Sequence, residues 1–184
     1  MEHKAWHHFL TITQHKLLVM QNCFRVGLFK QGLLHDLSKY SPAEFLTGVH
    51  YYQGDRSPNA AEREEKGYSS AWLHHKGRNK HHYEYWTDLS LETRRYEPVE
   101  MPRRYLVEMV MDRRAACMTY QGKAYTSASP VKYFQKSRER LLMHPNTEKA
   151  LGYLLEMLRD KGEEETFRYI RQSVLKDKPF PWEL

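Results

Sequence analysis

The chain has few of the features that mark secreted, membrane-spanning or disulfide-rich proteins. Only two of its 184 residues are cysteines, Cys23 and Cys117, so a disulfide framework is not expected. It has no run of about 18 apolar residues, the length that a membrane-spanning helix needs. The first residues also lack the uninterrupted apolar stretch of a signal peptide. We therefore expect a cytoplasmic protein that makes no contact with a membrane.

Several motifs that would identify an activity are missing as well. The sequence has no zinc-finger cysteine pattern, no glycine-rich phosphate loop and no serine or cysteine nucleophile motif. It also has no internal repeat and no low-complexity segment. Any chemistry must therefore come from other side chains.

Charged residues and histidines are abundant in the chain. Hydrophobic residues make up 40% and charged residues 28% of the chain, which is typical of a globular domain. The formal net charge is +6, and a basic surface favours phosphate-bearing partners without specifying one. The chain has 11 histidines, five of which lie between positions 50 and 82.

Apolar residues recur at helical spacing along most of the chain, and no segment alternates convincingly as a strand would. We predict an all-α fold, with residues 1–184 forming a single compact domain and 130–184 its C-terminal helices. The expected helices are 3–26, a stretch ending near 40, 41–52, 59–66, 70–75, 79–86, 102–121, 129–143, 147–158 and 164–175, with an irregular linker at 87–101. Ser41, Pro42 and Glu44 suggest a helix start with a capping box.

The pair His35-Asp36 is the first candidate metal-binding feature. Imidazole and carboxylate are ordinary ligands of a catalytic divalent metal. Adjacent helical residues point about 100° apart, so the two can share a metal only near a helix end or a helix crossing. Lys39 lies four residues after His35 and three after Asp36, so on a helix it shares a face with them. The plain alternative is an ordinary polar pair near a helix end.

A second feature is the segment 74–82, which contains two histidine pairs, His74-His75 and His81-His82. Aromatic and apolar residues flank it, which indicates that it packs on the core, where clustered imidazoles need partners. A solvated histidine-rich loop is the alternative. Which of these four histidines would be ligands is left open.

Asp112 is the third feature, because it lies at the edge of an apolar helical run. A carboxylate there is costly unless it is paired. Pairing with an arginine such as Arg113 or Arg114 is the alternative to metal binding.

In this order, the three features resemble the HD superfamily of metal-dependent phosphohydrolases, over roughly residues 10–130. The doublet in Leu33-Leu34-His35-Asp36-Leu37-Ser38-Lys39 carries the resemblance, together with His15 before it and Asp112 after it. The adjacent pair His81-His82 suits the additional histidines of dinuclear members. The Gly-Tyr-Pro motif of the cyclic-dinucleotide branch is absent. The pattern also looks like a branch of the superfamily with no known function.

The resemblance implies an HD-like helical bundle that binds one or two divalent transition-metal ions (Mn, Fe, Co, Ni or Zn). The implied ligands are His15, His35, Asp36, His75, His81, His82 and Asp112. A metal-activated water would hydrolyse a phosphoester, most simply in a nucleotide or another small phosphorylated compound. The candidate catalytic cations are Lys39 and Arg78, with Lys76 and Arg113 as further clamps for phosphate oxygens.

Two other functions fit parts of the same sequence. A di-iron oxygenase of the HD type would use nearly the same ligands. A non-catalytic nucleic-acid-binding protein would use the pairs Arg94-Arg95, Arg103-Arg104 and Arg113-Arg114 with exposed aromatic residues; we do not favour it. The substrate, the identity of the metal and the oligomeric state are not determined by the sequence.

Overall fold

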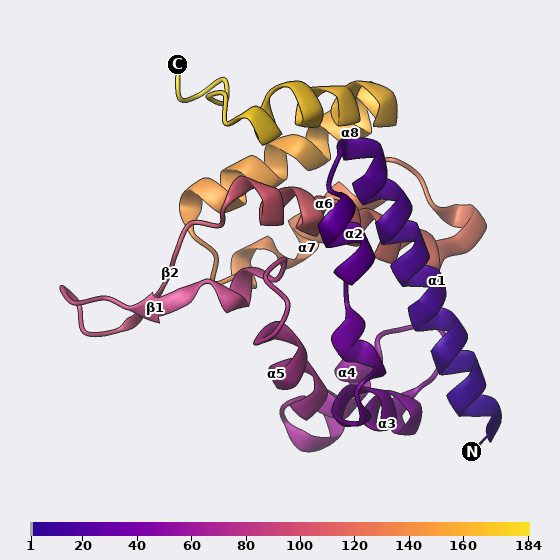
Figure 1. The fold of residues 1–184 in the computed structure, drawn as a ribbon. Helices are drawn as coiled ribbons and strands as arrows, with labels where there is room; N and C mark the ends of the chain where they lie inside the picture. Colours follow the sequence, from indigo (N-terminus) through magenta and orange to yellow (C-terminus); the bar gives the residue numbers. More distant parts are fainter. Residues whose placement is uncertain (1) are drawn as a thin grey trace.

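Two long helices and a pair of helices joined at a kink form the frame of the computed structural model, which describes residues 2–184 (Figure 1). They are α1 (Glu2–Val26), α6 (Arg103–Gln121) and α8 (Pro145–Gln172). Helix α6 packs against both α1 and α8. The predicted all-α fold is confirmed, and the described residues form one domain.

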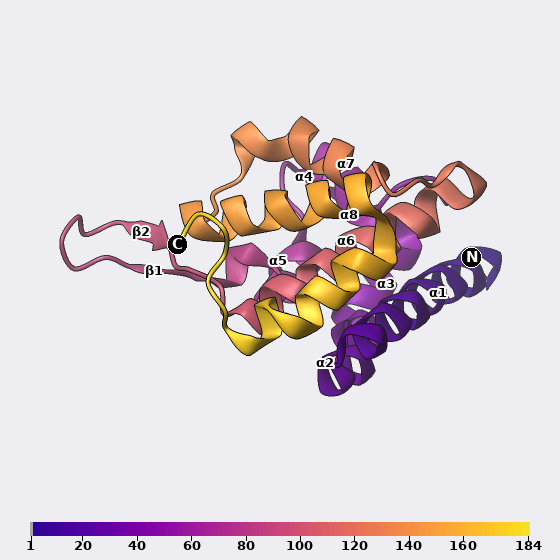
Figure 2. The same ribbon diagram turned by 90° about the horizontal axis from the view of Figure 1, so that it is seen from above.

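Shorter helices complete the domain around this frame (Figures 1 and 2). They are α2 (Phe29–Leu34), α3 (Pro42–Tyr51), α4 (Pro58–Lys66), α5 (Ser70–Lys76) and α7 (Ser129–Ser137). Short 3-10 turns cover Leu37–Tyr40, Tyr83–Tyr85, Gly122–Ala124, Arg138–Arg140 and Val174–Lys176; the first of these is η1. Helix α2 packs back along α1, and α3 packs on α4 and α5.

The core lies where the frame helices meet. Val19 of α1, Val107 and Met111 of α6, and Leu151 and Leu154 of α8 are fully buried in one apolar cluster. Their spacing along each helix places them on one face, as the sequence pattern predicts. This packing fixes α1 against α6, and these two helices carry the first and last residues of the candidate site.

The C-terminal part of the chain contains two helical parts on either side of Gly162, as predicted. They were expected at 147–158 and 164–175, and α8 consists of two helices that meet at a kink. Gly162 has the non-helical angles φ +74° and ψ −179°, which glycine adopts without the steric cost that a side chain would add. Glycine therefore separates the two helical parts of α8, which run in different directions (Figure 2).

Two predictions about secondary structure were wrong. The linker predicted at 87–101 contains a small antiparallel hairpin, β1 (Thr87–Leu89) with β2 (Tyr96–Pro98), which extends away from the helices (Figure 1). Strands of three residues are too short to show alternation. The helix expected at 79–86 is only a 3-10 turn, because the Asn79 side chain donates to Ser38 Oγ and the His75 carbonyl instead of capping a helix.

None of the described helices combines the length and the apolarity that crossing a lipid bilayer requires. Cys23 and Cys117 are both free thiols inside the protein.

Candidate metal centre

The His35-Asp36 doublet lies at a break in the chain between α2 and η1. His35 ends α2 in an extended conformation, and Asp36 has φ +54° in the left-handed region. Asp tolerates this region better than most residues do. Because the backbone leaves the helix here, both adjacent side chains can turn toward the same buried space. The doublet therefore meets the geometric condition for sharing a site.

The Asp36 carboxylate is the centre of the cluster, and its two oxygens face different histidines. Oδ1 lies 3.3 Å from Nε2 of His75 and 3.3 Å from Nε2 of His81. Oδ2 lies 3.3 Å from Nε2 of His35 and 3.8 Å from Nε2 of His15. One carboxylate thus contacts histidines from α1, from α5 and from the segment after α5.

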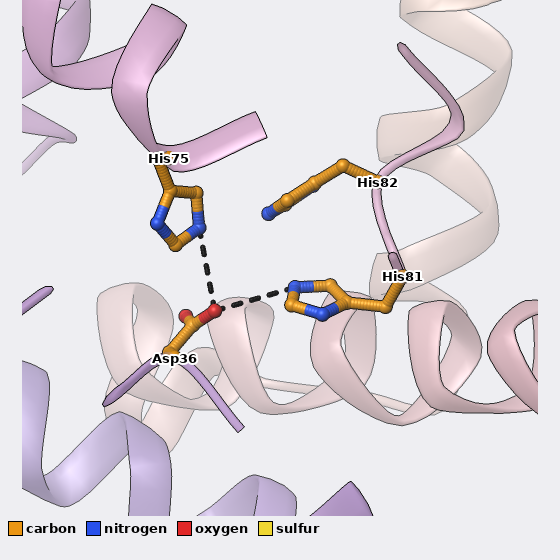
Figure 3. A group of neighbouring side chains, drawn as sticks. All are labelled: Asp36, His75, His81 and His82. Atoms are coloured by element: carbon orange, nitrogen blue, oxygen red, sulfur yellow. Dashed lines mark ion pairs between the residues drawn. The ribbon is translucent and has the colours of Figure 1, made fainter. Parts of the chain in front are cut away.

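These residues form two adjoining groups that could each hold a metal ion. One group is Asp36, His75, His81 and His82, and the other is His15, His35, Asp36 and Asp112. Within each group the potential ligand atoms lie within 4.8 Å of one another. Figure 3 shows the three imidazoles of the first group converging beside Asp36. Because Asp36 belongs to both groups, it could serve two ions, which in two-metal sites lie about 3.5–4 Å apart.

Several of these ligand atoms are buried without a hydrogen-bond partner among the described residues. They are Nε2 of His15, His35, His81 and His82, together with Oδ1 of Asp36. Their close contacts with one another and with Asp112, such as His15 Nε2 to Asp112 Oδ1 at 2.9 Å, lack the direction of a hydrogen bond. A buried polar atom without a partner costs about 1–3 kcal/mol, and native proteins contain few of them. Five such atoms that converge on one space match the donor set of a transition metal. The chemistry of the donors and their burial therefore fit a metal ion.

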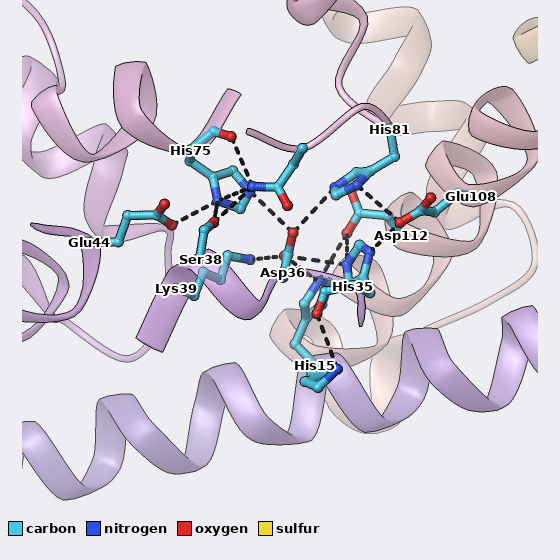
Figure 4. A network of polar contacts seen from close by, with 12 residues as sticks. His15, His35, Asp36, Ser38, Lys39, Glu44, His75, His81, Glu108 and Asp112 are labelled. Carbon is cyan, nitrogen blue, oxygen red and sulfur yellow. Dashed lines mark hydrogen bonds and ion pairs between the residues drawn. The ribbon is translucent and has the colours of Figure 1, made fainter. Parts of the chain in front are cut away.

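Two buried glutamates contact Nδ1 of three of these histidines, on the ring edge away from Nε2 (Figure 4). Glu108 Oε1 lies 3.0 Å from Nδ1 of His35 and 3.2 Å from Nδ1 of His81. Glu44 Oε2 lies 2.8 Å from Nδ1 of His75. With Nδ1–H donated to a carboxylate, Nε2 keeps its lone pair and faces the centre, as metal-binding histidines commonly do.

The acids of the cluster favour protonated imidazoles at two positions. Burial alone would lower the pKa of His35 and His75, but the charge of Asp36 and hydrogen bonds to acids outweigh it, raising the pKa of His35 well above its usual range and also that of His75. Metal binding there would therefore release protons. Burial alone would raise the pKa of Asp36, but the charges of His35, Lys39 and His75 outweigh it and hold the pKa well below its usual range. His82 has a pKa well below the usual range, because of burial and the charges of His81 and His75. The carboxylate is therefore ionised and this imidazole neutral, which are the forms that bind metals.

A cavity of about 610 Å³ opens beside the cluster. Lys39 and Arg113 supply cations to its wall, and His15, His75 and Asp112 connect it to the candidate ligands. Lys39 Nζ also lies 2.6 Å from Asp36 Oδ2. The cavity thus gives an external molecule access to the metal-binding groups and to the positive charges of Lys39, Arg113 and Arg56.

The structure brings all seven residues predicted as metal ligands into the two groups, and it places Lys39 against them. Arg78 lies elsewhere: it is exposed, donates to the His74 carbonyl and is not part of the cavity wall. The position of Arg78 does not support the catalytic role predicted for it. His74 belongs to neither group, since its Nδ1 faces Glu44 at 2.6 Å.

The roles of Glu44 and Glu108 were not predicted from the sequence. Glu44 was expected to complete a capping box with Ser41, but Ser41 makes no side-chain cap and Glu44 turns to the histidines. Glu108 lies four residues before Asp112, one turn away on the same face of α6, and this spacing could have identified it.

No curated protein and no solved structure is significantly similar to the chain. A family model described as a family of unknown function (DUF5662) matches residues 4–157, which include every member of the two groups. The chain therefore belongs to this family of unknown function.

Proposed function

We propose that the protein is a metal-dependent phosphohydrolase in which Asp36 would belong to the ligand sets of two metal ions. The observation that carries the proposal is the set of five buried ligand atoms, in and around Asp36, that make no hydrogen bond within residues 2–184. His75, His81 and His82 would hold one ion, and His15, His35 and Asp112 the other. When bound, divalent ions would act as Lewis acids and lower the pKa of a coordinated water, to about 7 in the best zinc sites.

The chain's own cations would hold the substrate. Lys39 and Arg113 line the same cavity as the candidate ligands His15, His75 and Asp112, where they could contact phosphate oxygens. Lys39 is too strongly protonated to be a ligand, because its pairing with Asp36 and the charge of Asp112 outweigh burial and raise its pKa above the usual range. An ammonium group at this position stabilises negative charge as it moves between oxygens.

The size of the cavity favours a small substrate over a polymer. A volume of about 610 Å³ lies within the range of roughly 300–1,000 Å³ that is typical of small-molecule sites. The candidate ligands are largely buried, and a molecule reaches them through this cavity. We therefore propose a nucleotide or another small phosphorylated compound.

The arginine pairs that suggested nucleic-acid binding are partly committed to the protein itself. Arg114 is 5% exposed and pairs with Asn22 and Glu163, and Arg103 pairs with Glu183. These side chains are not free to contact phosphates along a polymer, so we do not propose a nucleic-acid-binding function.

A substrate panel tests the proposal. The full chain is loaded in turn with Mn²⁺, Fe²⁺, Co²⁺, Ni²⁺ or Zn²⁺ and offered phosphomonoesters, cyclic and linear dinucleotides and nucleoside triphosphates. We expect phosphate release or phosphodiester cleavage with at least one metal, and none from Asp36→Ala. If the panel shows no hydrolysis and the iron form consumes oxygen, the protein is an oxygenase and the proposal is wrong.

A further inference from the structure

The two metal-binding groups share Asp36 but differ in their other ligands. The His75 group adds His75, His81 and His82 to Asp36, and the His15 group adds His15, His35 and Asp112. Oδ1 of Asp36 faces imidazoles of the His75 group, and Oδ2 faces imidazoles of the His15 group. Each group therefore has its own oxygen of the shared carboxylate.

Lys39 pairs with only one of these two oxygens. Its Nζ lies 2.6 Å from Oδ2 of Asp36, the oxygen of the His15 group (Figure 4). The turn η1 holds the two residues together, because the Lys39 amide donates to the Asp36 carbonyl at 3.0 Å. The fold therefore places an ammonium group beside the carboxylate oxygen that an ion in the His15 group would use.

The Lys39 side chain also borders the cavity. Three lysine and arginine side chains of the described residues line it, namely Lys39, Arg56 and Arg113. Arg56 pairs with Glu64, and of the three only Lys39 forms an ion pair with a candidate ligand. Its side chain is 28% exposed, and the four-carbon stem of lysine is flexible. The ammonium can therefore leave Asp36 for an anion in the cavity.

Charge repulsion should make the two groups unequal. An ion in the His15 group would lie close to the Lys39 ammonium, because both would contact Oδ2 of Asp36. Like charges a few ångströms apart repel strongly where little water screens them, and the Asp36 side chain is only 2% exposed. The His75 group has the other oxygen and three imidazoles. The His15 group should therefore bind its ion more weakly while Lys39 remains on Asp36.

We propose that Lys39 exchanges between Asp36 and the phosphate group of the substrate, so that phosphate and the ion of the His15 group bind cooperatively. The proposal rests on the phosphohydrolase function proposed above and adds an order of loading to it. The His75 group fills first, and the His15 group gains affinity when phosphate draws Lys39 into the cavity. By thermodynamic linkage, phosphate and this ion raise each other's affinity by the same factor, typically about 5-fold to 150-fold.

A metal titration tests the exchange without knowledge of the natural substrate. The chelator-stripped full chain is titrated with Co²⁺ at buffered free concentrations, with and without inorganic phosphate at matched ionic strength. We expect two binding steps, of which the second is the weaker. Phosphate should tighten the second step by about fivefold or more and leave the first unchanged. Asp112→Asn removes a ligand of the His15 group alone and should weaken the second step only, which assigns that step.

Variants at Lys39 separate the exchange from direct binding of phosphate to the metal. Lys39→Met keeps the stem without the charge, and Lys39→Gln is a second neutral variant. Both should tighten the second step about fivefold or more in the absence of phosphate, and phosphate should then lose most of its effect. Lys39→Arg retains the charge and should keep the second step weak. Lys30→Met, an exposed lysine on α2, is the matched control and should titrate as wild type does.

The outcomes distinguish this proposal from the phosphohydrolase proposal. If the neutral variants bind the second ion no more tightly than wild type, or if phosphate tightens it equally in all of them, the exchange is wrong. The hydrolase then stands if wild type cleaves a substrate of the panel. If the titrations behave as expected but no phosphoester is cleaved, the exchange stands and the hydrolase is wrong. A second ion that binds neither wild type nor the neutral variants also contradicts the exchange.

Discussion

Glu108 allows a quantitative test of how the protein orients its metal-binding histidines. Its Oε1 lies 3.0 Å from Nδ1 of His35 and 3.2 Å from Nδ1 of His81, and the residue is only 5% exposed. Glu108→Gln keeps the shape but replaces one carboxylate oxygen with an NH2 donor. The amide cannot hold both imidazoles as the carboxylate does, and buried hydrogen bonds to charged groups contribute about 1.5–3 kcal/mol each.

Loss of one such bond should weaken metal binding by about tenfold to a hundredfold, the usual effect of removing a residue that orients a ligand. Competition against a chelator, with Zn²⁺ or Co²⁺ as the probe ion, measures this affinity. Glu156→Gln, an exposed carboxylate on α8, is the matched control and should bind metal as wild type does. If Glu108→Gln folds and binds metal with unchanged affinity, the role assigned to Glu108 is wrong.

Two further predictions concern Lys39 and Glu62. Lys39→Met should keep its metal but lose turnover by about tenfold to a thousandfold; unchanged kinetics would remove Lys39 from the site. Glu62 is fully buried, and although burial raises its pKa, hydrogen bonds from Ser69, Ser70 and the Ala71 backbone lower it from 4.5 to about 2. Because the folded pKa is the lower one, this stabilisation of roughly 3 kcal/mol is present above pH 4.5 and is lost as pH falls toward 2. Denaturant unfolding at pH 7 and pH 3 should show Glu62→Gln less stable than wild type at pH 7 and closer to it at pH 3; a constant difference would contradict this.

The members of the candidate site could be predicted because each one conflicts with its local sequence context. Asp112 is an acid in an apolar helical run, and His81-His82 are imidazoles among aromatic residues. Such positions need partners, and the order of His15, His35-Asp36 and Asp112 suggested that they partner one another. The helices that carry them were also predictable, because α1 and α6 have long apolar faces.

Other features depend on tertiary packing, which the sequence pattern does not encode. Glu44 fitted a local helix-capping signal, and only the approach of α5 to α3 reveals that it faces His74 and His75. Arg78 was expected near the phosphate, but the end of α5 directs it outward and Arg113 lines the cavity in its place.

Metal content is the measurement that tests the central claim most directly. The untagged full chain is stripped with a chelator, offered Mn²⁺, Fe²⁺, Co²⁺, Ni²⁺ or Zn²⁺, freed of excess ion and analysed for bound metal. We expect two ions per chain for at least one metal, near-complete loss of both in Asp36→Ala because both groups share this carboxylate, and full retention in His74→Ala. A wild-type chain that binds none of these metals, or an Asp36→Ala variant that binds as much as wild type, would contradict the account.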